Sequence, residues 1–433
     1  MFLWRRLKER RDKVENNNDT KQLFFYFFSL FPLVDLLNGY LLSINHGLPV
    51  GTAYRLVLLG WIVMILLKEG VKKHSSLALV AFINVVIFSL LNLVQALFFS
   101  HSVSQIMTDF TALSKYFLWL GIALVFSEHI QEKKQLEKLV VRVNTFFSAG
   151  VIIPYVLGIG NFTYSNSKAG YKSFFFATND LTYAFVILST LLSFYLITQF
   201  SREKSSYFIF LTLLYGTNLI CMLLIGTKSG IGYGVVNLLV AFIYLIFIKS
   251  SISYNFKFFL IQTLLILLLF FLVIGKDMVL SVLDGVIDRM SYFYKVYEGN
   301  WVKILSSSRS IYLEDAYTGF LKYPLNYCIL WFGFGAANRW SLFGRHGGYI
   351  EMDFFDTLFS YGFIGLALLI VSLVYLVIKC KKEQGDKRYL YLFFVSLVYA
   401  FLTGHVFYSA MSSMIFGLVI SGMFITKERK VEE

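Results

Sequence analysis

Long apolar segments recur along this chain from Leu23 to Ile425, separated by short polar or charged breaks. A helix needs about 20 consecutive apolar residues to cross the hydrocarbon of a bilayer, and these segments have that length. Charged residues make up only 15% of the chain, whereas a soluble domain carries about 25%. Because hydrocarbon offers the backbone no hydrogen-bond partner, the segments should be helical. The sequence therefore predicts an all-α integral membrane protein.

We predict about 12 transmembrane helices. Their spans divide the chain into a basic tail (1–22), nine helices (23–275), a large loop (276–356), three helices (357–425) and a short tail (426–433). The predicted spans are 23–44, 51–67, 77–98, 110–127, 140–160, 180–200, 207–226, 230–248, 258–275, 357–378, 389–406 and 408–425.

The distribution of basic residues predicts the orientation of these helices. With the N-terminus inside the cell, the inside segments hold 26 of the 39 lysines and arginines. The short outside loops hold only Lys168, Lys172 and Lys228. Positive charge in short loops favours the cytoplasmic side. We therefore expect a multi-pass protein of the inner or plasma membrane with both termini in the cytoplasm.

The large loop, 276–356, should be a folded extracytoplasmic cap between helices nine and ten. Apolar residues at helical spacing predict an amphipathic helix over 279–290. A second helix should start at the cap Ser306–Ser308 and end before Pro324. Glycines then predict an irregular stretch that could approach a ligand closely: Gly333, Gly335, Gly344, Gly347 and Gly348.

Composition also argues against two classes of partner. The formal charge of +13 is spread over short clusters between apolar segments, and a nucleic-acid surface would need a basic patch interleaved with aromatic residues. The three cysteines, Cys221, Cys328 and Cys380, fall in different predicted compartments. No spacing typical of metal ligands is present. We expect no nucleic acid, no metal and no cofactor.

The first candidate site is the turn Thr227–Lys228–Ser229–Gly230. The next helix begins here, so its N-terminal amides and Lys228 would both favour an anion such as a phosphate. A tight interhelical turn with a lysine at the membrane interface would explain the same residues.

The second candidate is Arg309, followed closely by Glu314 and Asp315. An arginine in the first turn of a helix opposes the helix macrodipole, and an anionic ligand would remove that cost. The guanidinium group suits phosphate oxygens. An ion pair with Glu314 or Asp315 on a solvated face is the alternative.

The third candidate is the segment Gly344–Asp353, which holds Arg345, His346, Glu351 and Asp353 within nine residues. A histidine with a near-neutral pKa can accept a proton from an attacking hydroxyl. The two acids could instead cap the next helix. The remaining candidates His101, His129 and His405 lack such sequence neighbours, and we interpret them as structural.

The predicted helices also contain polar or ionisable groups, which are costly in a membrane and are candidates for function. Mutual ion pairing is the simpler explanation for Asp35, Arg55 and Lys115, and the two basic side chains could reach the interface. The full set is Asp35, Asn38, Arg55, Asn84, Asn92, Gln95, Lys115, Asn179 and Asp180.

Three features resemble the superfamily of O-antigen polymerases and O-antigen ligases, the Wzy-type membrane glycosyltransferases. One is the Thr227–Lys228–Ser229–Gly230 turn, where many members show Ser-Arg-Gly or Thr-Lys-Ser. Another is the single large outside loop with an early arginine, here Arg309. The third is the segment from Gly335 through His346 to Phe355–Gly365, which ends in Tyr361–Gly362–Phe363–Ile364–Gly365.

The resemblance implies a GT-C-like membrane glycosyltransferase that uses no nucleotide sugar, metal or cofactor. Its donor would be an oligosaccharide carried on a polyprenyl diphosphate in the lipid bilayer. By this resemblance, Lys228 and Arg309 would hold the diphosphate and His346 would activate the acceptor hydroxyl. Glu351 is a further catalytic candidate, and the set of further diphosphate-binding candidates is Ser229, Arg339 and Arg345.

Three functions remain possible. A polymerase joins lipid-linked repeat units into a capsular or O-antigen-like polysaccharide, and a ligase transfers finished glycan to another acceptor. The richness in Lys, Phe, Asn and Tyr favours a low-GC bacterium. Many such bacteria are Gram-positive and lack the lipid A acceptor that a ligase would use, so we favour a polymerase. A flippase for lipid-linked oligosaccharides or another transporter is the alternative from a different class, but it should carry its charges in a central cavity, whereas here they gather in the outside loop 276–356. Other polysaccharide-export proteins could be partners.

Overall fold

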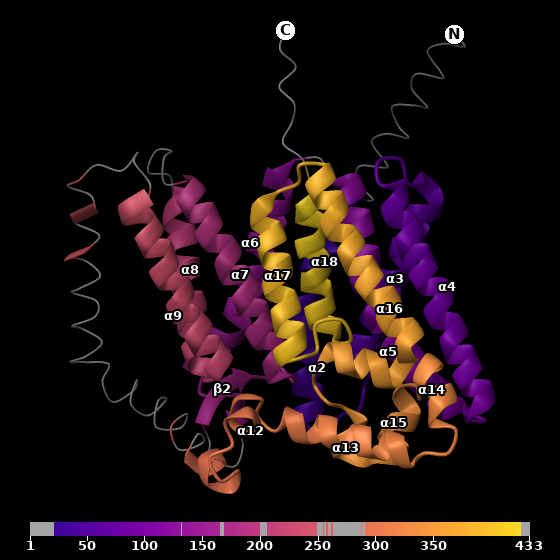
Figure 1. The fold of residues 1–433 in the computed structure, drawn as a ribbon. Helices are drawn as coiled ribbons and strands as arrows, with labels where there is room; N and C mark the ends of the chain where they lie inside the picture. The colour runs from indigo at the N-terminus through magenta and orange to yellow at the C-terminus, as the bar shows by residue number, and fades with distance from the viewer. Residues whose placement is uncertain are drawn as a thin grey trace, which may run out of the picture.

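The computed structural model describes residues 21–130, 132–164, 169–199, 206–248 and 291–425, with isolated positions at 254, 257–258, 261–262 and 287. The long helices run side by side as a bundle, and a group of shorter helices lies across one end of it (Figure 1). We call this group, residues 301–348, the cap.

The first half of the bundle consists of long apolar helices joined by short loops. Helix α5 lies at its centre and packs against α3, α4 and α18. The elements are α2 (Phe31–Ser43), α3 (Val50–Glu69), α4 (Ser75–Phe98), α5 (Val103–His129), α6 (Lys133–Val156), α7 (Thr178–Gln199), α8 (Ser206–Ile225), α9 (Lys228–Ile243) and the π-helix η1 (Tyr244–Ile248).

The second half comprises the cap and the last three long helices. In the cap, α13 packs on α15, and α15 packs on α5. The elements are α12 (Trp301–Leu305), α13 (Arg309–Lys322), α14 (Asn326–Phe332), α15 (Ala336–Gly348), α16 (Asp353–Lys382), α17 (Lys387–Leu402) and α18 (Ala410–Phe424).

Eight helices in the described part of the chain are long and apolar enough to cross a membrane. A ninth is added if the helices Lys21–Ser29 and Phe31–Ser43 form one span, since a bend of 41° separates them. Pro32 lies at the start of α2, and proline removes a backbone donor there and favours such a break. This agrees with the predicted all-α membrane class.

The predicted number of 12 spans stays a prediction. The predicted helix 258–275 lies mostly outside the described residues, as does most of the amphipathic helix over 279–290. Helices α17 and α18, which correspond to the predicted spans 389–406 and 408–425, have 16 and 15 residues. The predicted extent of the large loop, from residue 276, is likewise described only from residue 291 onward.

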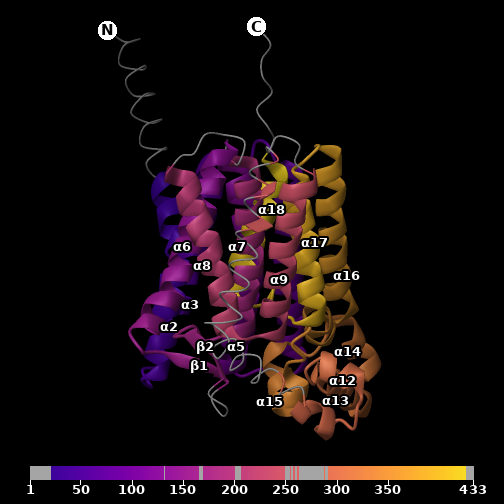
Figure 2. The same cartoon turned by 90° about the vertical axis from the view of Figure 1, so that its left-hand side faces the viewer.

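A small β-hairpin is an element that the sequence analysis did not predict. Strands β1 (Asn161–Tyr164) and β2 (Ala169–Ser173) pair antiparallel between α6 and α7. In Figure 2 the hairpin lies at the same end of the bundle as the cap. The Thr163 hydroxyl donates to the carbonyl of Ile225 at 2.7 Å, which ties the hairpin to the end of α8.

The cap confirms one sequence prediction and corrects two. A helix does run from Arg309 to Lys322, before Pro324. The serine cap was partly wrong: Ser308 is left-handed (φ 75°) and makes no side-chain capping bond, whereas the Ser306 hydroxyl accepts the Ser310 backbone N–H at 3.3 Å. The irregular stretch was partly wrong: Gly333 and Gly335 have positive φ angles, but the glycines at 344–348 belong to helix α15. Packing of α15 on α13 and α5 overrides their low helix propensity.

Two glycines allow the cap to dock on the bundle. Gly362 interrupts α16 with φ 65° and ψ −168°, a conformation that is essentially restricted to glycine. A Cβ there would lie 2.3 Å from the carbonyl of Trp331, and one on Gly333 would lie 2.4 Å from that of Ser360. The backbones of α14 and α16 therefore touch. Gln95 donates to the carbonyls of Phe332 and Ser360 beside this contact, so its role is structural.

Candidate functional site

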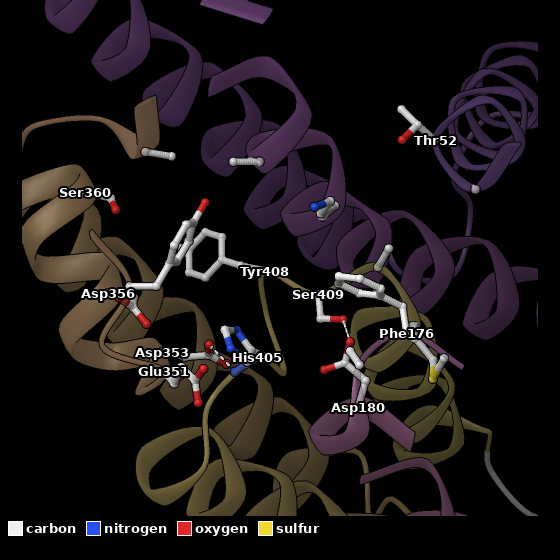
Figure 3. A pocket seen from close by; sticks show the side chains of 18 of the residues that line it. Thr52, Phe176, Asp180, Glu351, Asp353, Asp356, Ser360, His405, Tyr408 and Ser409 are labelled. Atoms are coloured by element: carbon white, nitrogen blue, oxygen red, sulfur yellow. Dashed lines mark hydrogen bonds between the residues drawn. The ribbon is translucent and has the colours of Figure 1, made fainter. Parts of the chain in front are cut away.

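A cavity of about 550 Å³ lies where the cap meets the bundle. Side chains from α2, α3, α5, α7, α13, α15, α16 and α18 reach it, as do the loops before α16 and before α18 (Figure 3). Its charged and titratable lining residues come from segments far apart in the sequence: Asp35, Arg55, Lys115, Asp180, Arg339, Glu351, Asp353, Asp356 and His405.

Asp353 fixes the conformation of the loop before α18, which contains His405. Its buried carboxylate accepts the backbone N–H groups of His405 (2.6 Å), Val406 (2.6 Å) and Phe407 (3.0 Å). Gly404 makes the turn possible, because a Cβ there would lie 2.2 Å from the carbonyl oxygen of Glu351. The loop before α18 is thus held against the loop before α16.

Glu351 and His405 form the centre of the site. Both have positive φ angles, 61° and 65°, a strained conformation for residues other than glycine that is often found at functional positions. Their side chains lie close enough for Glu351 to raise the pKa of the imidazole. Figure 3 shows the imidazole beside Glu351 and Asp353, with Asp180 across the cavity from it and hydrogen-bonded to Ser409.

The charges of these groups are coupled. Burial alone would lower the pKa of His405, but the neighbouring carboxylates of Glu351, Asp180 and Asp353 raise this pKa to about 9. Burial would raise the pKa of Glu351, but His405 and Arg309 together lower it. At neutral pH the pair is therefore an imidazolium and a carboxylate.

This coupling predicts a pH dependence of stability. The raised pKa of His405 contributes stability that is complete below about pH 6.5 and is lost as the pH rises through about 9. The loss should be at most roughly 3 kcal/mol. Thermal unfolding of the purified protein should show the melting temperature falling over this range. His405→Gln should melt lower at pH 6.5 and lack this fall, whereas an equal fall in the variant would assign it to other groups.

Most cations of the site are paired with carboxylates. Arg309 Nη2 lies 2.9 Å from Glu351 Oε2, and Arg339 Nη2 lies 2.8 Å from Asp356 Oδ1. Arg55 forms an ion pair with Asp35, which agrees with mutual pairing of the intramembrane charges. Arg339 is almost completely buried and also donates to the Ser360 hydroxyl at 2.8 Å.

Lys115 is the exception among the described cations of the cavity. Its half-buried side chain lines the cavity, and it forms no ion pair with a described residue. The charges that act on it most are those of Arg55 and Asp180. A lysine held in this position supplies a point charge and three donors to a ligand anion.

Aromatic side chains provide the other part of the cavity wall. Trp340 and Tyr349 contact each other with ring centroids 5.7 Å apart, and Tyr312 and Phe176 line the cavity as well. Such rings combine an apolar face with nearby polar groups. A cavity of this composition suits a ligand with both apolar surface and hydroxyl groups.

The structure brings several predicted site residues together. Glu351 and Arg339 line the cavity, and Arg309 reaches it through its ion pair with Glu351. The side chains of Arg345 and His346 lie outside the described part of the structure, although both residues belong to α15.

Lys228 and Ser229 lie at the start of α9 and do not line the cavity. The Lys228 ammonium group lies 5.6 Å from the ring centroid of Phe293. The Tyr399 hydroxyl of α17 donates to the carbonyl of Asn179 at 2.8 Å.

His405 is the site residue that sequence reasoning missed. Its acidic partners Glu351, Asp353 and Asp180 lie more than 50 residues away in the sequence, so the search for charged sequence neighbours could not find them. The other two histidines do have structural surroundings, since His101 contacts Asp109 at 3.1 Å and His129 contacts Glu69 at 3.4 Å. Two features of the sequence could have pointed to His405: the adjacent Gly404 and the polar break before α18.

The chain matches a known protein family. A family model described as "O-antigen ligase like membrane protein" matches residues 17–303, about two thirds of the chain. A search of curated proteins gave no match. The matched region holds Asp35, Arg55, Lys115 and Asp180, and it ends before Arg309. The chain belongs to this family of O-antigen ligase-like membrane proteins.

Proposed function

We propose that this O-antigen ligase-like protein is a polymerase that joins oligosaccharide repeat units carried on polyprenyl diphosphate. The growing chain would be a surface polysaccharide, of capsular or O-antigen type, made at the outer face of the inner or plasma membrane. Membership of the family supports a membrane enzyme that processes glycans. The donor, the acceptor and the polymerising reaction are our proposals.

The observation that carries the proposal is the composition of the cavity. It combines Lys115, a cation with no ion-pair partner among the described residues, with a carboxylate–imidazolium pair and aromatic walls, at one end of a membrane bundle. Breaking the bond between the sugar and the diphosphate develops negative charge on the leaving diphosphate. Fixed cations aimed at that charge lower the barrier. We assign this role to Lys115 and Arg309, assisted by Arg339 and, at the edge, by Lys228 and Ser229.

Attack by the acceptor hydroxyl requires a base. The Glu351 side chain is 38% exposed, so its carboxylate is accessible to an acceptor. A carboxylate is a sufficient base where the sugar carries oxocarbenium character and the hydroxyl loses its proton late, as in inverting glycosidases. Arg309 and His405 would keep Glu351 ionised and aimed. His346, which the resemblance suggests, is the second candidate base, and Arg345 is a further candidate for phosphate binding.

The position of the charges favours a transferase over a flippase. The charged lining residues gather where the cap meets the bundle, whereas a carrier should bind its substrate in a cavity midway across the membrane. A ligase would use the same donor chemistry, and only the acceptor distinguishes it.

Reconstitution tests the proposal. The purified protein in liposomes should convert lipid-linked repeat units into a ladder of longer glycans, in the presence of a chelator and without nucleotide sugar. A single transfer to an added foreign acceptor, with no ladder, would identify a ligase. Movement of the lipid-linked unit across the bilayer without any new glycosidic bond would identify a flippase. A strict need for a nucleotide sugar would refute the assigned donor.

A further inference from the structure

A second cavity, of about 630 Å³, lies at the end of the bundle opposite the cap. It is formed where α6, α8 and α17 begin and where α7 and α18 end. Its lining residues are Lys133, Lys134, Leu136, Glu137, Lys138, Tyr195, Thr198, Tyr207, Arg388, Tyr389, Gly422 and Ile425.

The rim of this cavity carries an excess of positive charge. Lys133 and Arg388 share one carboxylate, that of Asp386, at 2.7 and 2.8 Å. Lys134 and Lys138 lie four residues apart on the exposed side of α6 and form no ion pair with any described residue. Like charges at this spacing repel each other.

The ends of the helices add to this positive potential. Helices α6 and α8 begin at this cavity without an acidic residue in their first turns, whereas the start of α17 is already capped by Asp386, whose carboxylate accepts the Arg388 N–H at 3.0 Å. Helix N-termini carry partial positive charge, so lysines in the first turns of α6 are unfavourable there. A bound anion would relieve both the repulsion between lysines and this conflict with the macrodipole.

The floor of the cavity is apolar and aromatic. Tyr195 and Tyr389 are buried with their hydroxyl groups 2.8 Å apart, and the Tyr207 hydroxyl donates to Glu137 at 2.8 Å. These bonds satisfy the hydroxyl groups of the three tyrosines. The faces of their rings, beside Leu136 and Ile425, can therefore contact hydrocarbon.

From these features we propose that the second cavity binds an anionic phospholipid of the adjacent leaflet. The lipid phosphate lies between Lys134, Lys138 and Arg388, and an acyl chain lies over the tyrosine rings. The rule that places basic residues on the cytoplasmic side explains positive charge at this end of the bundle. It does not explain why that charge surrounds a cavity with an apolar floor.

Lipid titration of the full-length, delipidated protein tests this site. Native mass spectrometry would count bound phosphatidylglycerol and phosphatidylcholine with identical acyl chains, and thermal unfolding would follow the stabilisation by each lipid. Wild-type protein should bind phosphatidylglycerol at least tenfold more tightly. The double variant Lys134→Gln/Lys138→Gln should weaken that binding about 30-fold, from the attraction between two lysines and an anionic lipid, and leave phosphatidylcholine binding unchanged.

The matched control is Lys381→Gln/Lys382→Gln. These two exposed lysines lie at the same end of the bundle, at the end of α16, and do not line the cavity. Binding in this control should stay within about twofold of wild type. An equal loss in both double variants would reduce the effect to net charge and overturn the site. Displacement of phosphatidylglycerol by millimolar inorganic phosphate would overturn the assignment to a lipid.

Discussion

Replacing Glu351 by glutamine is expected to slow glycan transfer by about 10²- to 10⁴-fold, the range for loss of a general base. The amide is close in size to the carboxylate but cannot accept the proton of the acceptor hydroxyl at neutral pH. It also leaves Arg309 without its carboxylate counter-ion, because the amide oxygen can still accept a hydrogen bond but carries no charge. Initial rates with lipid-linked repeat units in liposomes would measure the effect.

Three further variants make this result interpretable. Glu314→Gln removes an exposed carboxylate from α13 in the same cap, outside the cavity lining, and should transfer at the wild-type rate. Glu351→Asp keeps the charge with a shorter reach and should recover part of the activity. If Glu351→Gln were active and His346→Ala inactive, the base would be His346, and Glu351 would only hold Arg309.

The helices could be predicted because their physical cause is local. An apolar run of spanning length has one solution in hydrocarbon, and the predicted 51–67 and 77–98 correspond to α3 and α4 within two residues at each end. The cap was harder to predict. The glycines at 344–348 belong to a helix because α13 and α5 pack against α15, and a sequence window does not contain these neighbours.

The candidate site shows the same division. Glu351, Arg309 and Arg339 could be chosen from the sequence, since each carries charge in a segment rich in functional side chains. His405 could not, because its partners join it only when the loops before α16 and α18 meet. The sequence analysis included the pairing of Arg55 with Asp35 as one alternative. It could not predict that Lys115 lacks a described partner, because this depends on where α3 and α5 lie relative to each other.

Lys115→Met is expected to lower kcat/KM for the lipid-linked donor by about 10²-fold, a typical loss when one group that stabilises developing charge is removed. Its stability should not fall, because methionine removes a half-buried charge that has no carboxylate partner among the described residues. Sugar-free polyprenyl diphosphate would serve as the probe. Its inhibition constant should rise by a similar factor if Lys115 holds the diphosphate.

Arg55→Met is the informative contrast, because it removes a neighbouring cation that has a partner. Asp35 is only 8% exposed, so losing Arg55 leaves a buried carboxylate unpaired and should destabilise the protein by about 3 kcal/mol. Lys115→Met should therefore lose donor binding at an unchanged melting temperature, whereas Arg55→Met should melt lower. A Lys115→Met variant that melted as low as Arg55→Met would assign Lys115 to the fold. If polyprenyl diphosphate inhibited Lys115→Met as strongly as wild type, Lys115 would have no contact with the diphosphate. The leaving group would then have to be held by Arg309 and Arg339.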